Sequence, residues 1–222
     1  MRSNNPIQQS AKTAGLAYLL IIVTSILSMI FGPYKLIVEG DIPATINNIA
    51  ANQQLYRAGA TYDLLMFIGV IILSVALFNV LKTVNKTVAL TALISRTGEA
   101  LIGSLTVVCS MAIIFLVNAD IESESNQKIL TLIFDIKDSL LNIVFSFLGF
   151  GSVLFCYLFY KARYIPRILA AFGILAFVLV FTESIAVMLF SVESTIVTGL
   201  AAILFEIIIG IWLLIKGVKI PD

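Results

Sequence analysis

Six long apolar runs constrain the fold of this chain more than any other feature of its sequence. Each has roughly 20 or more residues, the length that a helix needs to cross a hydrocarbon core of roughly 30 Å. The runs cover residues 12–32, 60–81, 88–117, 139–160, 166–190 and 196–215. Lipid offers no partners to backbone polar groups, so runs of this length predict helices. We therefore expect an all-α, polytopic transmembrane bundle of about six helices that forms a single domain over residues 1–222.

The scarcity of charge supports a membrane protein over a soluble one. Charged residues make up 12% of the chain, about half the share in a typical soluble domain. The run at 14–31 is too long for a signal-peptide core, and no A-x-A-like site follows it before Gly32. We expect it to remain as the first spanning helix. A net charge of +1 gives no reason to expect nucleic acid as a partner, so the expected partner is the lipid bilayer.

The positions of lysine and arginine predict the orientation of the bundle, because cytoplasmic loops are enriched in these residues. With both termini in the cytoplasm, the cytoplasmic segments hold Arg2, Lys12, Lys82, Lys86, Lys161, Arg163, Arg167, Lys216 and Lys219. The opposite side then holds Lys35, Arg57, Lys128 and Lys137. Most acids also fall outside, namely Glu39, Asp41, Asp120, Glu122, Glu124, Asp135, Asp138 and Glu193, whereas Asp222 lies inside. The sequence therefore predicts an N-in/C-in topology.

Both long outer loops contain helical patterns. In the first, Asp41 is a suitable N-cap, and Pro43 suits the first turn of a helix. Ile46 and Ile49 then share a face, which predicts a short helix on the outer membrane surface. The second loop, 118–138, becomes apolar after an acidic stretch. Its apolar part is either a surface helix or an outer extension of the fourth span.

Small and polar residues recur along one side of three spans. These stripes are Ala14, Tyr18, Ser25, Ser28 and Gly32 in the first, Asn142, Ser146, Gly149 and Cys156 in the fourth, and Gly199, Ala202, Glu206 and Gly210 in the sixth. Small residues allow membrane helices to approach closely, and hydroxyl groups can bond across the interface. The stripes therefore predict tight helix packing.

The composition excludes several chemistries. The chain has no histidine, so serine–histidine hydrolysis and histidine-ligated zinc sites are impossible. Cys109 and Cys156 lie in apolar runs, where packing is their expected role. Asp135, Asp138 and Asn142 spell a DxxDxxxN pattern that resembles the magnesium site of intramembrane prenyltransferases, but no second acidic motif accompanies it. No nucleotide-binding loop is present either, so we expect no cofactor.

Ionisable residues inside the spans are the candidate functional groups, because a charge in lipid is costly and needs a partner or water. Arg96 and Glu99 stand at i and i+3, on one face of the third span. Glu206 is central in the sixth span. Glu183 lies in the outer half of the fifth. The candidate binding residues are therefore Arg96, Glu99, Glu206, Glu183, Asp63 and Arg57, where Asp63 is expected to be solvated or paired with Arg57.

The carboxyl groups outnumber the bases inside the spans. Arg96 and Glu99 can neutralise one another as an internal pair, but no second intramembrane arginine remains for Glu206 and Glu183. At least one of these carboxyls is therefore expected to be protonated, hydrogen-bonded or exposed to water. Glu183 could share an outward-opening polar pocket with Glu206.

Three functions are compatible with this pattern. The first is binding or transport of a small amphiphile, lipid headgroup or cation at an intramembrane polar pocket. The second is an intramembrane enzyme that uses carboxylates as acid and base on a lipid-like substrate, which the lack of a recognisable nucleophile disfavours. The third is a sensory or immunity protein that acts through membrane-protein partners. The sequence leaves the oligomeric state open.

The chain also resembles a known bacterial integral-membrane family. The segments PYKLIVEGDIPATINNIAANQQLYRAGATYDLL, LFNVLKTVNKTVALTALISRTGEA, YKARYIPRILAAFGILA and EIIIGIWLLIKGVK carry the resemblance. The family is the domain of unknown function 4386. The resemblance implies a multi-pass protein of the bacterial plasma membrane with about six or seven helices. It also implies that Arg57, Asp63, Arg96 and Glu99 are recurrent features, and it implies no activity.

Overall fold

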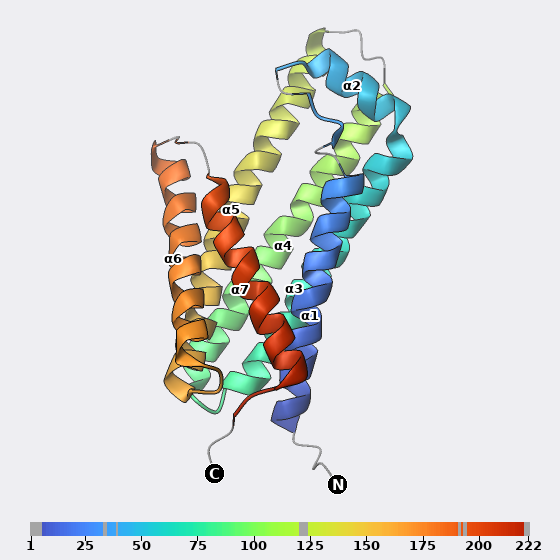
Figure 1. The fold of residues 1–222 in the computed structure, drawn as a ribbon. Helices are drawn as coiled ribbons and strands as arrows, with labels where there is room; N and C mark the ends of the chain where they lie inside the picture. Colours follow the sequence, from blue (N-terminus) through green and yellow to red (C-terminus); the bar gives the residue numbers. More distant parts are fainter. Residues whose placement is uncertain are drawn as a thin grey trace.

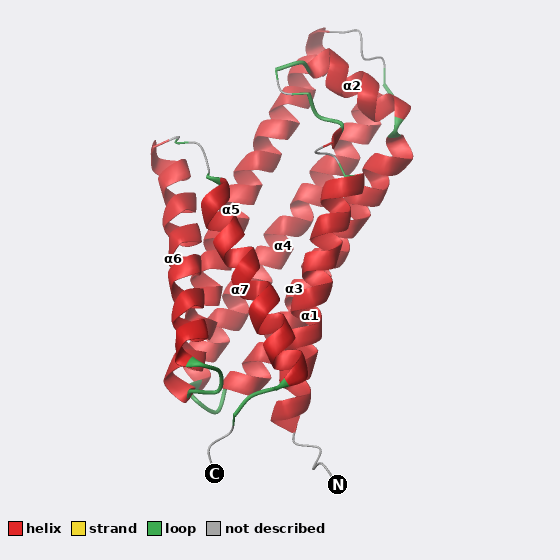
Figure 2. Cartoon of the chain, viewed as in Figure 1, coloured by secondary structure: helices red, strands yellow, loops and turns green. Residues whose placement is uncertain are grey.

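The computed structural model describes residues 6–32, 35–38, 40–119, 124–190, 192 and 195–219. Within this part of the chain, every regular element is a helix (Figures 1 and 2). The helices are α1 (Pro6–Phe31), α2 (Ile42–Ala51), α3 (Gln53–Leu81), α4 (Lys86–Val117), α5 (Glu124–Ala162), α6 (Arg167–Phe190) and α7 (Ile196–Ile215). All except α2 are long and apolar enough to cross a membrane. The all-α class with six spans is therefore confirmed.

The six long helices form an elongated bundle in which the first and last helices are neighbours. α1 packs against α3 and α7, α4 lies between α3 and α5, and α6 contacts α5 and α7. α7 runs obliquely between α6 and α1, and α1 begins at the same end of the bundle at which α7 ends (Figure 1). We call this end the termini end and the opposite end the α2 end. This arrangement agrees with an even number of spans.

The outer surface of the bundle is apolar, as expected for a protein whose solvent is lipid. Met29, Phe115 and Val197 each expose more than 70% of their surface. Exposed side chains of this kind, repeated along every long helix, would be costly in water. The structure therefore agrees with a multi-pass membrane protein.

The charge pattern has a spatial counterpart. The basic residues of the α3–α4, α5–α6 and C-terminal segments lie at the termini end, and the described Asp41 and Asp135 lie toward the α2 end. Arg2, Glu39, Asp120, Glu122, Glu193 and Asp222, together with the side chain of Glu124, lie outside what the structure describes. The compartment that each end faces stays a prediction.

The short helix predicted after the first span is present as α2. The Asp41 carboxylate accepts a hydrogen bond from the Ala44 N–H at 2.8 Å, and proline stands in the first turn. The buried Ile46 and Ile49 belong to an apolar cluster with residues of α3, α4 and α5. The apolar face of α2 therefore packs on the bundle itself, whereas the sequence pattern suggested a helix lying on lipid.

The fourth span is much longer than its apolar run. α5 has 39 residues and is nearly 60 Å long at about 1.5 Å per residue. Helix α5 contains the apolar part of the second outer loop. The prediction that this part extends the fourth span is therefore confirmed, and the alternative of a separate surface helix is wrong. Leu130 explains the difference, because it is buried in the same apolar cluster as Ile46 and Ile49 and so gives the extension a packed face.

The small-residue stripe of the sixth span marks a real interface with the first span, except at Gly199. A Cβ atom on Gly15 would lie 2.6 Å from the backbone nitrogen of Leu214 and 2.7 Å from the carbonyl oxygen of Gly210, so the backbones of α1 and α7 touch. Ala202 is also buried. Gly199 is exposed with open space around it, which shows that the stripe of the sixth span ends before the α2 end.

Candidate functional site

Arg96 and Glu99 form a buried ion pair inside the bundle. The Nη1 atom of Arg96 lies 2.8 Å from Oε2 of Glu99, and both side chains are almost fully shielded. The spacing of three residues brings the two groups to the same face of α4. The sequence predicts this pair, and the structure shows it directly.

Helix α5 holds the arginine in place. A Cβ atom on Gly151 would lie 2.9 Å from Cγ of Arg96, so the backbone of α5 packs directly on the aliphatic part of the side chain. Beside this contact, the Ser95 hydroxyl donates a hydrogen bond to the carbonyl oxygen of Phe147 at 2.9 Å. These contacts hold the aliphatic part of the Arg96 side chain against α5, next to Glu99.

Glu206 reaches the same region from α7. Its carboxyl group lies within electrostatic range of Arg96 and Glu99, and Tyr18 and Cys156 are close to the same charges. We call Tyr18, Arg96, Glu99, Cys156 and Glu206 the central cluster. Helices α1, α4, α5 and α7 each contribute to it, although their positions are far apart in the sequence.

The central cluster is short of positive charge. Arg96 is the one base that interacts with Glu206 among the residues that the structure describes, and it is already in direct contact with Glu99. No hydrogen bond or ion pair joins the Glu206 carboxyl to any described residue. Glu206 is also half-buried, whereas Glu99 is buried. The cluster therefore contains a carboxyl group that has no bonded partner among the described residues.

Asp63 has different neighbours from those expected. Arg57 is exposed and forms no ion pair with Asp63 in the described structure. The Asp63 carboxyl instead lies within electrostatic range of the Lys137 ammonium of α5 and near the buried Ser28 hydroxyl of α1, which forms no well-aligned hydrogen bond. The pairing with Arg57 is therefore wrong. About one and two-thirds helical turns separate Arg57 from Asp63, which places them on different sides of α3.

Lys137 is a buried ionisable group that the sequence interpretation missed. Its side chain is 6% exposed, and its Nζ atom donates a hydrogen bond to the Ser110 hydroxyl of α4 at 2.9 Å. We call Ser28, Asp63, Ser110 and Lys137 the α2-end cluster. A signal was available, because the buried Leu130, Lys137 and Val144 follow one another at a seven-residue spacing on one helical face.

Glu183 lies away from the central cluster. Its carboxylate accepts hydrogen bonds from the backbone N–H of Thr195, from the Thr195 hydroxyl at 2.8 Å, and from the Thr198 hydroxyl. These bonds connect α6 to the first turn of α7. Thr198 is eight residues before Glu206, about 12 Å along the helix. The structure therefore does not bring Glu183 and Glu206 together, and Glu183 stabilises the start of α7.

The acidic pattern on α5 does not converge on a metal site. Asp135 and Asp138 are both exposed. Among the residues that the structure describes, no three histidine, cysteine, aspartate or glutamate side chains come close enough to hold a metal ion.

The comparison with protein families agrees with this architecture. The model of a family described as Domain of unknown function (DUF4386) matches residues 13–217. The chain belongs to this family. The DUF4386 match includes all members of both clusters, from Tyr18 to Glu206. No curated protein and no solved structure shows significant similarity to the chain.

Proposed function

We propose that this DUF4386 protein binds and transports a small amphiphile with a positive charge, and that the Glu206 carboxyl exchanges this ligand for a proton. The observation that carries the proposal is the pairing within the central cluster. Arg96 is in contact with Glu99, and Glu206 has no ion-pair partner among the described residues. Glu206 is the group in this cluster whose charge needs an external partner.

The charge of the cluster favours a cation over an anion. An anionic ligand would have to displace Glu99 from Arg96, which would leave a buried carboxylate without its partner and would cost several kcal/mol. A cation or a proton neutralises Glu206 without disturbing that pair. Lipid headgroups without a positive charge are therefore poorer candidates than cationic amphiphiles.

Competition between a proton and the ligand follows from the same argument. A carboxylate in an apolar environment is costly unless something neutralises it. A proton and a ligand cation satisfy the same requirement and cannot both occupy Glu206 fully. Release of one would therefore accompany binding of the other, which is the basis of coupled exchange across a membrane.

The location of the protein is part of the proposal. The loops at the termini end carry Lys82, Lys86, Lys161, Arg163, Arg167, Lys216 and Lys219. This excess of bases supports a cytoplasmic termini end and therefore cytoplasmic termini, in a bacterial plasma membrane. The α2 end would then face outward, with Glu206 near the middle of the bilayer.

Equilibrium binding of tetraphenylphosphonium, a lipophilic cation, to the protein in detergent tests the proposal. Wild-type protein should bind the probe more tightly as pH rises, because fewer protons then compete for Glu206. The Glu206→Gln variant should lose roughly tenfold or more in affinity together with the pH dependence. Asp135→Asn is the matched control, because it neutralises an exposed carboxyl on the same bundle. Equal binding by wild type and Glu206→Gln at every pH would refute the proposal.

A further inference from the structure

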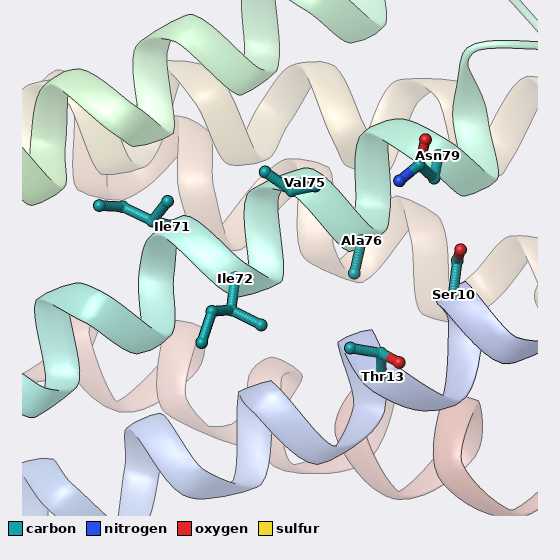
Figure 3. A pocket seen from close by; sticks show the side chains of 7 residues that line it. All are labelled: Ser10, Thr13, Ile71, Ile72, Val75, Ala76 and Asn79. Carbon is teal, nitrogen blue, oxygen red and sulfur yellow. The ribbon is translucent and has the colours of Figure 1, made fainter.

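An open groove lies between α1 and α3 near the termini end of the bundle. It encloses about 310 Å³. Ser10 and Thr13 point from α1 toward α3, while Ile72 and Ala76 point from α3 toward α1 (Figure 3). The groove is separate from the central cluster, which lies inside the bundle, and it faces the surrounding lipid.

The two ends of the groove differ in polarity. Ser10 and Asn79 lie together at the end nearer the termini, and Ile71 and Ile72 lie at the other (Figure 3). From Asn79 to Ile71 is eight residues, about 12 Å along α3. The polar end is near the membrane surface and the apolar end is in the hydrocarbon region, so the groove has the same polarity gradient as a lipid that lies beside it.

Two hydrogen-bond donors at the polar end have no acceptor among the residues that the structure describes. The Ser10 hydroxyl and the Asn79 amide nitrogen donate no hydrogen bond to any described residue. The ammonium of Lys82 donates to the Asn79 Oδ1 atom at 2.8 Å, which holds the charge at the rim of the groove and leaves two of its hydrogens available. A hydroxyl, an amide and an ammonium together suit a phosphate group, whose oxygens only accept.

The surrounding charge favours an anionic occupant. The described loops at the termini end carry lysine and arginine and no acidic residue. Anionic lipids are attracted to such juxtamembrane bases by about 1 kcal/mol for each base. The apolar walls exclude a free inorganic anion from most of the groove, because only its polar rim has donors.

We propose that this groove is a specific site for one anionic phospholipid of the leaflet at the termini end. Its phosphate accepts hydrogen bonds from Lys82, Ser10 and Asn79, and the upper part of one acyl chain lies along Ile72, Val75 and Ala76. This site is independent of ligand exchange at Glu206, since no residue is shared between them.

Native mass spectrometry of protein extracted from vesicles with equimolar phosphatidylglycerol and phosphatidylcholine tests the site. Wild-type protein should retain one phosphatidylglycerol in clear preference to phosphatidylcholine. Lys82→Gln should lower this occupancy roughly tenfold, the effect of losing a charged hydrogen bond. Lys86→Gln is the matched control, because it removes the same charge from an exposed position at the same end outside the groove.

A second variant tests the apolar half of the groove without changing charge. Thr13→Phe places a ring in the groove from an exposed position on α1, where lipid tolerates it, and should also displace the lipid. Equal loss in Lys82→Gln and Lys86→Gln, or equal retention of the two lipids by wild type, would overturn the proposal. Retention of inorganic phosphate in place of lipid at the same site would overturn it as well.

Discussion

The central cluster and the α2-end cluster both place ionisable groups inside the bundle, but they are assembled differently. In the central cluster, the key pair lies on one helix, with Arg96 and Glu99 in contact at 2.8 Å. In the α2-end cluster, Lys137 and Asp63 come from different helices and do not form a direct ion pair, and Lys137 uses Ser110 as its hydrogen-bond partner. The first cluster has a surplus carboxyl, and the second has equal numbers of acids and bases.

This difference separates two uses of buried charge. A closed pair with a surplus carboxyl beside it leaves one group free to bind something else, which suits a site. In the balanced set, the charges of Asp63 and Lys137 offset each other, and the hydrogen bond from Lys137 to Ser110 joins α5 to α4. This arrangement suits a structural role. The comparison predicts that the two clusters respond differently when a base is removed.

The largest effect is expected for Arg96→Met. The substitution leaves Glu99 and Glu206 without a positive neighbour, and an unpaired buried charge costs about 3–5 kcal/mol of unfolding free energy. Reversible unfolding by sodium dodecyl sulfate in mixed micelles measures this loss. The double variant Arg96→Met with Glu99→Gln should recover most of it, since no unpaired charge from that pair remains. If the single and the double variant both have the wild-type free energy of unfolding, the Arg96–Glu99 pair contributes nothing to stability.

A smaller loss is expected for Lys137→Met. The change removes the hydrogen bond to Ser110 and the favourable field at Asp63, and we expect about 1–3 kcal/mol in the same assay. A double-mutant cycle with Asp63→Asn should give a coupling of about 0.5 kcal/mol or more. The cycle that pairs Arg57→Gln with Asp63→Asn is the control and should give none. Coupling to Arg57 and not to Lys137 would contradict the neighbours assigned to Asp63.

The smallest effect is expected from Gly151→Ala, which tests how firmly α5 holds Arg96. The new methyl group would lie 2.9 Å from Cγ of Arg96 and 3.1 Å from Cβ of Ser95, so it forces the arginine away and should cost about 1 kcal/mol. Gly199→Ala is the matched control, because the space around Gly199 is open and alanine favours a helix by about 0.5–1 kcal/mol. A stabilising Gly151→Ala would show that the arginine is not held by this contact.

The parts of the structure that depend on short-range pattern could be predicted from the sequence. Six spans follow from apolar length, the N-cap of α2 follows from Asp41 and Pro43, and the Arg96–Glu99 pair follows from its spacing on one helix. The cap and the ion pair are decided within about one helical turn, and each span within one continuous run of about 20 residues. All of them therefore depend on a contiguous stretch of chain, where sequence pattern is informative.

The parts that depend on packing between distant segments could not be predicted. The partner of Asp63 depends on where α5 begins, because only the extended helix carries Lys137 inward. Glu183 and Glu206 looked alike in sequence, yet Glu183 bonds to Thr195 and Thr198, whereas Glu206 lies within electrostatic range of Arg96 without a bond to it. Which helices surround a buried carboxyl is a property of the bundle, and a single sequence contains no direct record of it.

The contact between Gly15 of α1 and Gly210 of α7 has a consequence for biosynthesis. The ribosome makes α1 first and α7 last, so the face of α1 that packs against α7 stays exposed to lipid until nearly the whole chain has been translated. Helix α4 enters the bilayer with its arginine and glutamate already able to neutralise each other. Glu206 arrives on the final helix, and its negative charge joins the others only when that helix docks. The last step of assembly is therefore also the step that completes the central cluster.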